Sequence, residues 1–144
     1  MLHLTQSDRA NRNKNTNSDG GELMEVIKNG SIPEEDATNA PLFYGGAVSR
    51  QPIVAGGKSS YYNFSQVNFA AGAKNKFHTH TSDQILFVTK GVGIVANESE
   101  EIEISEGDTA LIPSGEKHWH GATDRSSFSH ISLTHPESQT EMFD

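Results

Sequence analysis

From Leu42 onward the sequence is a succession of short strand-like segments separated by turns, most of which contain glycine. No stretch carries apolar residues at the 3.6-residue period of an amphipathic helix. The turns read AGGKSS, AAGAKN, KG, ESE, EGD and SGE, and they consist of residues that favour tight turns. Many short strands joined in this way predict an antiparallel sandwich or barrel. The expected strands are 45–54, 61–70, 84–90, 93–97, 101–105, 109–113, 117–122 and 127–133.

The chain before this pattern has a different character. Residues 1–23 are rich in Asn, Asp, Ser and Gly and hold few large apolar side chains, so we expect them to be a disordered extension. A length of 144 residues corresponds to one domain, which we place at 24–144. Within it, residues 31–40 are expected to form one short helical turn.

Composition excludes several classes of protein. The net charge of −8 argues against nucleic acid as a partner. No stretch approaches the roughly 18 apolar residues of a membrane span, and the start of the chain lacks the apolar run of a signal peptide. The absence of cysteine rules out disulfides and thiolate metal sites and suits a reducing compartment, so we expect a cytoplasmic protein that acts on a small molecule.

The histidines are concentrated in one part of the sequence. Five of the seven lie between positions 78 and 130. Since side chains alternate along a strand, His78 and His80 project to one side, as do His118 and His120. Taken singly, each histidine is more simply a hydrogen-bonded core residue, Trp119 a core or interface aromatic and Gln84 a satisfied amide. His130 lies on a third strand. Because three strands each place histidine on one face, the sequence nevertheless predicts a site inside the barrel.

Two motifs give these residues a family resemblance. The spacing Gly72-x5-His78-x-His80-x3-Gln84-x6-Gly91 resembles the first cupin motif, with Gln in place of the usual Glu. The spacing Gly107-x5-Pro113-x-Gly115-x2-His118 resembles the second, with Ala122 in place of its final Asn. The resemblance implies an all-β double-stranded β-helix, that is, a jelly-roll barrel. It also implies a divalent metal ion held by His78, His80, Gln84 and His118.

The glutamine changes the electrostatics of such a site. Three neutral imidazoles and a neutral amide leave a divalent metal at +2, whereas a carboxylate reduces it to +1. The metal is therefore a stronger Lewis acid, favours an anionic ligand and is held more weakly. Manganese is the first choice, although Fe, Ni, Co and Zn accept the same ligands. Asp83 neighbours Gln84, but strand alternation turns its side chain away from the site.

A closer resemblance extends over most of residues 24–133. FHTHTSDQILFVTKGVG, IPSGEKHWHGA and SHISL are similar to a group of small bacterial cupins, which includes carboxymuconolactone-decarboxylase-associated proteins and manganese-dependent hydroxynitrile lyases. This likeness implies ligation by three His and one Gln, and a proton-transfer base twelve residues after the last ligand, where His130 lies. The departures are a shorter C-terminus and TSD instead of a Pro-containing turn, and both bear on substrate specificity.

We therefore expect a metal-dependent enzyme with lyase chemistry of the hydroxynitrile-lyase type. His130, with a pKa near its ordinary value of roughly 6.5, would transfer the proton, and His120 would orient the substrate or support a ligand. Three alternatives stay open: an Fe(II)- or Mn-dependent dioxygenase, a non-catalytic cupin that binds a small ligand, and a purely structural role for these two histidines. We also expect a homodimer in which segment 42–54 pairs with the second subunit.

Overall fold

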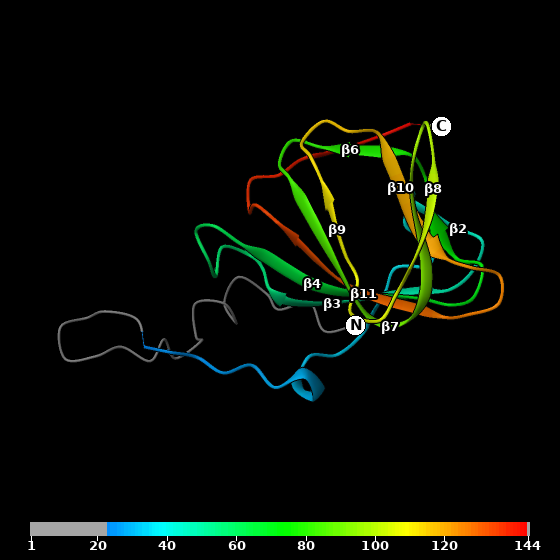
Figure 1. Ribbon diagram of the computed structural model, residues 1–144. Coiled ribbons are helices and arrows are strands. Elements are labelled where there is room, and N and C mark those ends of the chain that lie inside the picture. The colour runs from blue at the N-terminus through cyan, green and yellow to red at the C-terminus, as the bar shows by residue number, and fades with distance from the viewer. Residues whose placement is uncertain (1–22, 144) are drawn as a thin grey trace.

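The computed structural model describes residues 23–143, in which the chain is almost entirely β-structure (Figure 1). The seven longer strands are β3 (Val48–Val54), β4 (Asn63–Phe69), β7 (Gln84–Asn97), β8 (Glu101–Ser105), β9 (Thr109–Ile112), β10 (His118–Ala122) and β11 (Phe128–Thr134). The short strands are β1 (Glu35–Asp36), β2 (Phe43–Tyr44), β5 (Lys74–Asn75), β6 (His78–His80) and β12 (Thr140–Met142). One 3₁₀ helix, η1, spans Asn29–Ser31, and no helix of the described residues is long and apolar enough to cross a membrane.

Strand β7 connects the two halves of the barrel. Its first half pairs with β9 and β11, and β11 continues through β4 to β3. Its second half pairs with β8 and β10, and β10 pairs in turn with β5 and β6. Every pairing is antiparallel, and Figure 1 shows the sheet curling around a common interior. The predicted jelly-roll barrel is confirmed.

The bend in β7 corrects one prediction from the sequence. The KG pair at 90–91 was expected to be a turn between two strands, but β7 runs through it without interruption. Gly91 has a φ of +73°, and a Cβ at this position would overlap the backbone oxygen of Ser127. Glycine is thus needed here for a bend within one long strand, because a side chain would strain the backbone and collide with the neighbouring loop.

The helical turn expected at 31–40 is also wrong. The 3₁₀ helix lies earlier, and Glu35 and Asp36 form a strand paired with Arg50 and Ser49 of β3. The backbone N–H of Ala37 continues this pairing by donating to the carbonyl oxygen of Val48 at 2.8 Å. An isolated helical turn is only marginally stable, so the hydrogen bonds available at the edge of β3 determine the outcome.

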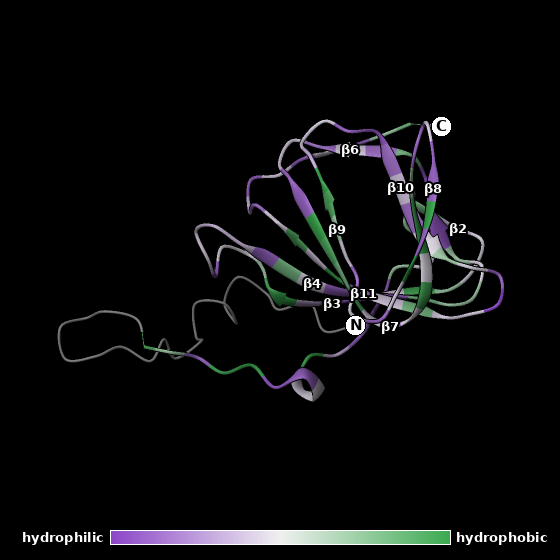
Figure 2. Cartoon of the chain, viewed as in Figure 1, coloured by the Kyte–Doolittle hydropathy of each residue, from purple (hydrophilic) through white to green (hydrophobic). Residues whose placement is uncertain are grey.

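The interior of the barrel has an apolar part and a polar part. Phe69 and Phe128 stack with ring centroids 5.9 Å apart, and Phe43 meets Phe69 edge-on at the same distance. Histidines follow directly on this aromatic layer, since the ring of His130 lies 5.6 Å from that of Phe69. Figure 2 shows hydrophobic and hydrophilic segments following one another along the strands. The apolar layer holds the strands together, and the histidines lie next to it inside the barrel.

Candidate metal centre

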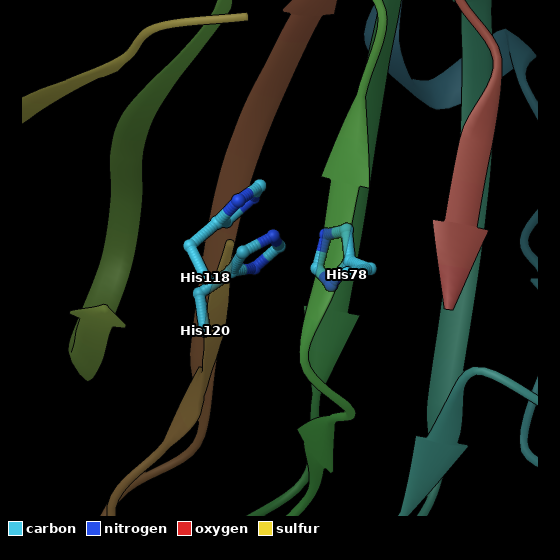
Figure 3. A group of neighbouring side chains, drawn as sticks. All are labelled: His78, His118 and His120. Carbon is cyan, nitrogen blue, oxygen red and sulfur yellow. The ribbon is translucent and has the colours of Figure 1, made fainter. Parts of the chain in front are cut away.

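Neighbouring strands bring the motif histidines together. His78 on β6 and His118 on β10 are register partners, and their ring centroids lie 4.3 Å apart. His80, two residues further along β6, has its ring centroid 4.9 Å from that of His78 and 5.4 Å from that of His118. Figure 3 shows His78 facing the two histidines of β10 across the interior. The three rings thus converge, as strand alternation predicts.

Each of these three rings is held through its Nδ1 atom. His78 Nδ1 donates to a backbone carbonyl at 2.6 Å and His118 Nδ1 to another at 2.8 Å, while His80 Nδ1 lies 3.0 Å from a threonine hydroxyl. The partners are Lys76, Glu116 and Thr140 respectively. A ring whose Nδ1 carries the proton presents the lone pair of its Nε2 atom. All three histidines are therefore arranged to ligate through Nε2.

Gln84 at the start of β7 supplies an oxygen to the same group. Its side chain is buried, and its Nε2 donates to Ser132 Oγ at 2.9 Å. This hydrogen bond orients the amide so that Oε1 faces the cluster, 3.1 Å from His118 Nε2. Asp83 points elsewhere: its Oδ1 accepts a hydrogen bond of 2.9 Å from the backbone N–H of Ser114. The structure brings together all four predicted ligands and leaves out Asp83.

The chemistry of this donor set fits a divalent metal ion. His80 Nε2 is buried and has no hydrogen-bond partner in the described structure, which is costly unless something binds it. Three imidazole nitrogens and one amide oxygen form a mixed N/O set suited to Mn, Fe, Co, Ni or Zn. Burial lowers the pKa of His78 to about 3 and that of His80 to about 4, and it lowers the pKa of His118 as well. The ligands are consequently neutral, as metal binding requires.

His120 lies close enough to compete with His80 as a ligand. Among the described residues, the group of three whose ligand atoms all lie within 4.8 Å of one another consists of His78, His118 and His120, and it does not include His80 (Figure 3). The nitrogens of His120, however, already have partners: Nδ1 lies 3.0 Å from His130 Nε2, and Nε2 lies 3.1 Å from Asn75 Nδ2. Hydrogen bonding therefore separates His120 and its partner His130, called here the second group, from His80, whose Nε2 has no partner in the described structure.

Asn75 determines the tautomer of His120. Its Oδ1 accepts a hydrogen bond of 2.8 Å from the backbone N–H of His120, so its Nδ2 must be the atom that donates to His120 Nε2. Nε2 then carries the lone pair, and Nδ1 carries the proton that is donated to His130 Nε2. The sequence offered no signal for Asn75, which reaches His120 because β5 pairs with β10.

His130 lies behind His120 as seen from the metal ligands. Its side chain is fully buried, and its ring contacts His120, Phe69 and Phe128. Burial lowers the pKa of His130 to about 4, and the backbone of Ile131 offsets part of this effect. The expected pKa near 6.5 is therefore wrong for the folded chain, because an imidazolium ion in this aromatic layer would lack solvation.

A cavity of about 330 Å³ with a mixed polar and aliphatic lining opens beside His118. It lies between β8 and β9, and His118 forms part of its wall. Most of the remaining wall is aliphatic, with two carboxylates: the principal residues are Val95, Ile102, Ile104, Leu111, Ile112, Glu100 and Glu116. A small molecule in this cavity would meet both aliphatic and polar side chains, with His118 on one side.

A jelly-roll barrel with inward-facing histidines on β6 and β10 defines the metal-binding barrel class to which cupins belong. Comparison with known proteins confirms this. The Cupin domain family model matches residues 65–133. The (R)-mandelonitrile lyase of Granulicella tundricola is 33% identical over 111 residues, which cover 76% of this chain and 83% of that protein. The chain belongs to the cupin family.

Solved structures agree with the fold. A cupin-like protein from Thermotoga maritima is 25% identical, with a TM-score of 0.69 over 83% of this chain and 89% of that one. The polyketide cyclase RemF from Streptomyces resistomycificus is only 12% identical, yet it has a TM-score of 0.74 over 85% of this chain and 87% of that one. Such different sequences share the barrel, so the fold alone does not determine the reaction.

Proposed function

We propose that this protein is a metal-dependent lyase that cleaves a small cyanohydrin into a carbonyl compound and hydrogen cyanide. The observation that carries the proposal is the hydrogen-bonded pair of buried histidines, His120 and His130, directly beside a set of four metal-ligating side chains. The relative named (R)-mandelonitrile lyase supports this choice of reaction.

Four residues would hold the metal, His78, His80, Gln84 and His118, and manganese remains our first choice. A divalent ion in this position supplies a Lewis acid that polarises an oxygen of the substrate. The neutral Gln84, with its amide fixed by Ser132, leaves the full +2 charge of the ion in place. Such an ion would stabilise developing negative charge on the substrate oxygen more strongly than an ion with a carboxylate ligand.

The cavity between β8 and β9 favours an uncharged substrate with an apolar substituent. Aliphatic side chains such as Val95 and Ile112 line it, and burying a charge among them would be costly. Glu100 and Glu116 add negative charge to its wall, which disfavours anions there. We infer that the substituent on the reacting carbon occupies this cavity, while the hydroxyl group faces the histidines.

In this proposal the base is His120 and not His130, the base expected from the sequence, because His130 is fully buried against Phe69 and Phe128 behind His120. The Nε2 lone pair of His120 faces Asn75 in the resting protein. The substrate hydroxyl takes the place of the Asn75 amide as the hydrogen-bond donor and gives its proton to Nε2. The carbon–carbon bond to the nitrile then breaks, the carbonyl forms, and the bonding electron pair leaves on cyanide, which takes the proton. His130 accepts the Nδ1 proton of His120 in a hydrogen bond and so fixes the tautomer in which Nε2 is the base.

The test is cyanide release from a series of cyanohydrins by the manganese-loaded protein, assayed in air and under strict anaerobic conditions. A lyase releases cyanide equally in both. Turnover that needs oxygen, measured with phenolic or diketone substrates, would instead show the dioxygenase. Saturable binding without turnover of any of these compounds would show a ligand-binding cupin.

Two variants separate the metal from the proton-transfer pair. His120→Phe should retain bound manganese and lose cyanide release, whereas His80→Ala should lose both. The matched control is Trp119→Phe, which lies between two of the site histidines on β10 but on its opposite face. That variant should keep both metal and turnover.

A further inference from the structure

The C-terminal strand β12 lies against the strand that carries two of the metal ligands. It pairs with all three residues of β6, and its Thr140 is the register partner of His80. On the other side, β6 has a single register pair with β10, between His78 and His118. Figure 1 shows the red C-terminal end of the chain running along β6. Most of the backbone pairing that holds this ligand strand therefore comes from the end of the chain.

Further contacts attach the residues on either side of β12 to the site. The backbone N–H of Phe143 donates to the carbonyl oxygen of Phe77 at 2.8 Å. The Lys117 ammonium lies over both aromatic rings, 4.7 Å from the centroid of Phe143 and 5.5 Å from that of Phe77. At the other end of the strand, Thr81 and Gln139 exchange two hydrogen bonds, of 3.0 and 2.9 Å. Phe77, Lys117 and Thr81 each adjoin a ligand histidine in the sequence, so the C-terminal segment is attached to the site on both sides.

Thr140 is the residue through which this segment reaches a ligand. Its Oγ1 lies 3.0 Å from Nδ1 of His80, which is 60 residues away in the sequence. The Nδ1 atoms of His78 and His118 instead meet the backbone carbonyl two residues earlier in their own segments. Those carbonyls are in place as soon as the local strand forms, whereas the partner of His80 is present only when β12 is docked. Among the ligand histidines, His80 is thus the one oriented by a distant part of the chain.

His80 also depends on this contact more than the other ligands depend on theirs. The group of histidines whose ligand atoms already lie within 4.8 Å of one another consists of His78, His118 and His120, without His80. The Nε2 atom of His80 is buried and has no hydrogen-bond partner in the described structure, so Nδ1 provides the polar contact that orients the ring. A partner on the far side of a ligating imidazole fixes its rotation and tautomer. The Thr140 hydroxyl fills this role for His80.

We propose that β12 completes the metal site. Thr140 is a positioning residue that holds His80 among the ligands, and docking of the strand and binding of the metal stabilise each other. This rests on the metal site of the proposed function, but not on the reaction that the site catalyses. If the docked strand favours metal binding, the bound metal must by linkage favour the docked strand to the same extent.

A double-mutant cycle with manganese affinity as its readout tests the positioning role. Thr140→Val keeps the shape of the side chain and removes the hydroxyl, so it should weaken affinity by about 10-fold, whereas Thr140→Ser should preserve it. In the His80→Phe background, Thr140→Val should have no effect, because the ring that it orients is gone. The matched control is Glu141→Gln, whose side chain alternates to the other face of β12. That variant should bind manganese like the wild type.

Hydrogen exchange measures the reciprocal effect at the strand itself. The N–H groups of Phe143 and Thr81 donate to the carbonyl oxygens of Phe77 and Gln139, so their exchange reports whether the segment is docked. Saturating manganese should slow this exchange by about 10-fold in the wild type, which is the factor expected for affinity. In Thr140→Val, saturating manganese should leave the exchange rate nearly unchanged.

Three results would overturn the proposal. Affinity that is unchanged in Thr140→Val, or that falls equally in both backgrounds, would show that the hydroxyl does not act through His80. Exchange at Phe143 that does not respond to manganese would show that the strand and the metal are not coupled. A wild type that binds no manganese would overturn both this proposal and the metal site. Manganese binding that follows the cycle without any release of cyanide would contradict the proposed function while supporting the role of β12.

Discussion

Two groups of histidines share the inner face of this barrel, and they differ in their hydrogen bonds. The ligand group is His78, His80 and His118, and the second group is His120 with His130. His78, His80 and His118 are each fixed through Nδ1 by a backbone carbonyl or a hydroxyl, which leaves Nε2 facing the others. His120 has the same H-x-H spacing to His118 that His80 has to His78. Both of its nitrogens are nevertheless engaged, one by His130 and one by Asn75.

The comparison shows how neighbouring imidazoles acquire different chemistry. A nitrogen with a free, inward-facing lone pair can ligate a metal, whereas a ring with a polar partner on each nitrogen is fixed in one tautomer and can take up a proton at a defined atom. The polar partners, rather than the position of the histidine in the motif, distinguish the two groups. The following predictions alter one group at a time.

The largest effect should come from removing a ligand. His78→Ala should lose essentially all bound metal and all turnover, because the two remaining imidazoles and a neutral amide hold a divalent ion weakly. Metal content measured by mass spectrometry after dialysis checks this. His135→Ala is the control: the ring of His135 accepts from the backbone N–H of Glu137 and lies outside both groups. Full metal content in the His78→Ala variant would contradict the assignment of His78 to the ligand group.

Changing the second group should affect turnover but not metal content. His130→Phe places an aromatic ring beside Phe69 and Phe128, which suits the surrounding layer, and it removes the acceptor for the His120 Nδ1 proton. We expect kcat for cyanide release to fall by about 100-fold or more with manganese still bound. Loss of metal together with turnover would mean that the second group also supports the metal site.

Acid should destabilise the metal-free protein through both groups. The pKa of His130 is lowered to about 4 in the folded chain, compared with 6.5 when unfolded. Between these values the unfolded chain binds the extra proton, so stability is fully present above pH 6.5 and is lost progressively as the pH falls to about 4. His130 alone should account for about 3 kcal/mol. Urea unfolding of wild type and His130→Phe at pH 7 and pH 4 should show a smaller acid-induced loss in the variant.

The smallest effect should come from releasing the ligand amide. Ser132→Ala removes the hydroxyl that accepts from Gln84 Nε2, so the amide can rotate away from the site. We expect metal affinity to weaken by about 10-fold without any change in fold. Competition with a fluorescent chelator would measure the change, and Ser129→Ala on the same strand is the matched control. Unchanged affinity would show that the amide is held by other contacts.

Much of the barrel was predictable from periodicity and turns. Strands β8, β9, β10 and β11 lie within a residue or two of their predicted positions, because polar turns of obvious composition separate them. The prediction of a turn at the KG pair was wrong. Gly91 is needed because the backbone of Ser127 passes close to it, and this contact between residues distant in sequence could not be predicted. Segment 31–40 failed because its strand exists only through pairing with β3.

Part of the site was also predictable from the spacing of residues along the strands. Spacing and alternation placed His78, His80, His118 and Gln84 on converging faces. The polar partners that separate one histidine group from the other could not be predicted. Lys76 and Glu116 act through backbone carbonyls, whose positions depend on local geometry, and Asn75 meets His120 only through the pairing of β5 with β10.

The most direct test of the central claim is a count of the histidine nitrogens bound to manganese by pulsed electron paramagnetic resonance. The wild type should show three. With manganese in excess, which also populates the weakened site of a ligand variant, His120→Phe should show three nitrogens and His80→Phe should show two, because His80 ligates and His120 does not. Two nitrogens in the His120 variant with three in the His80 variant would contradict the account and assign the metal to His78, His118 and His120.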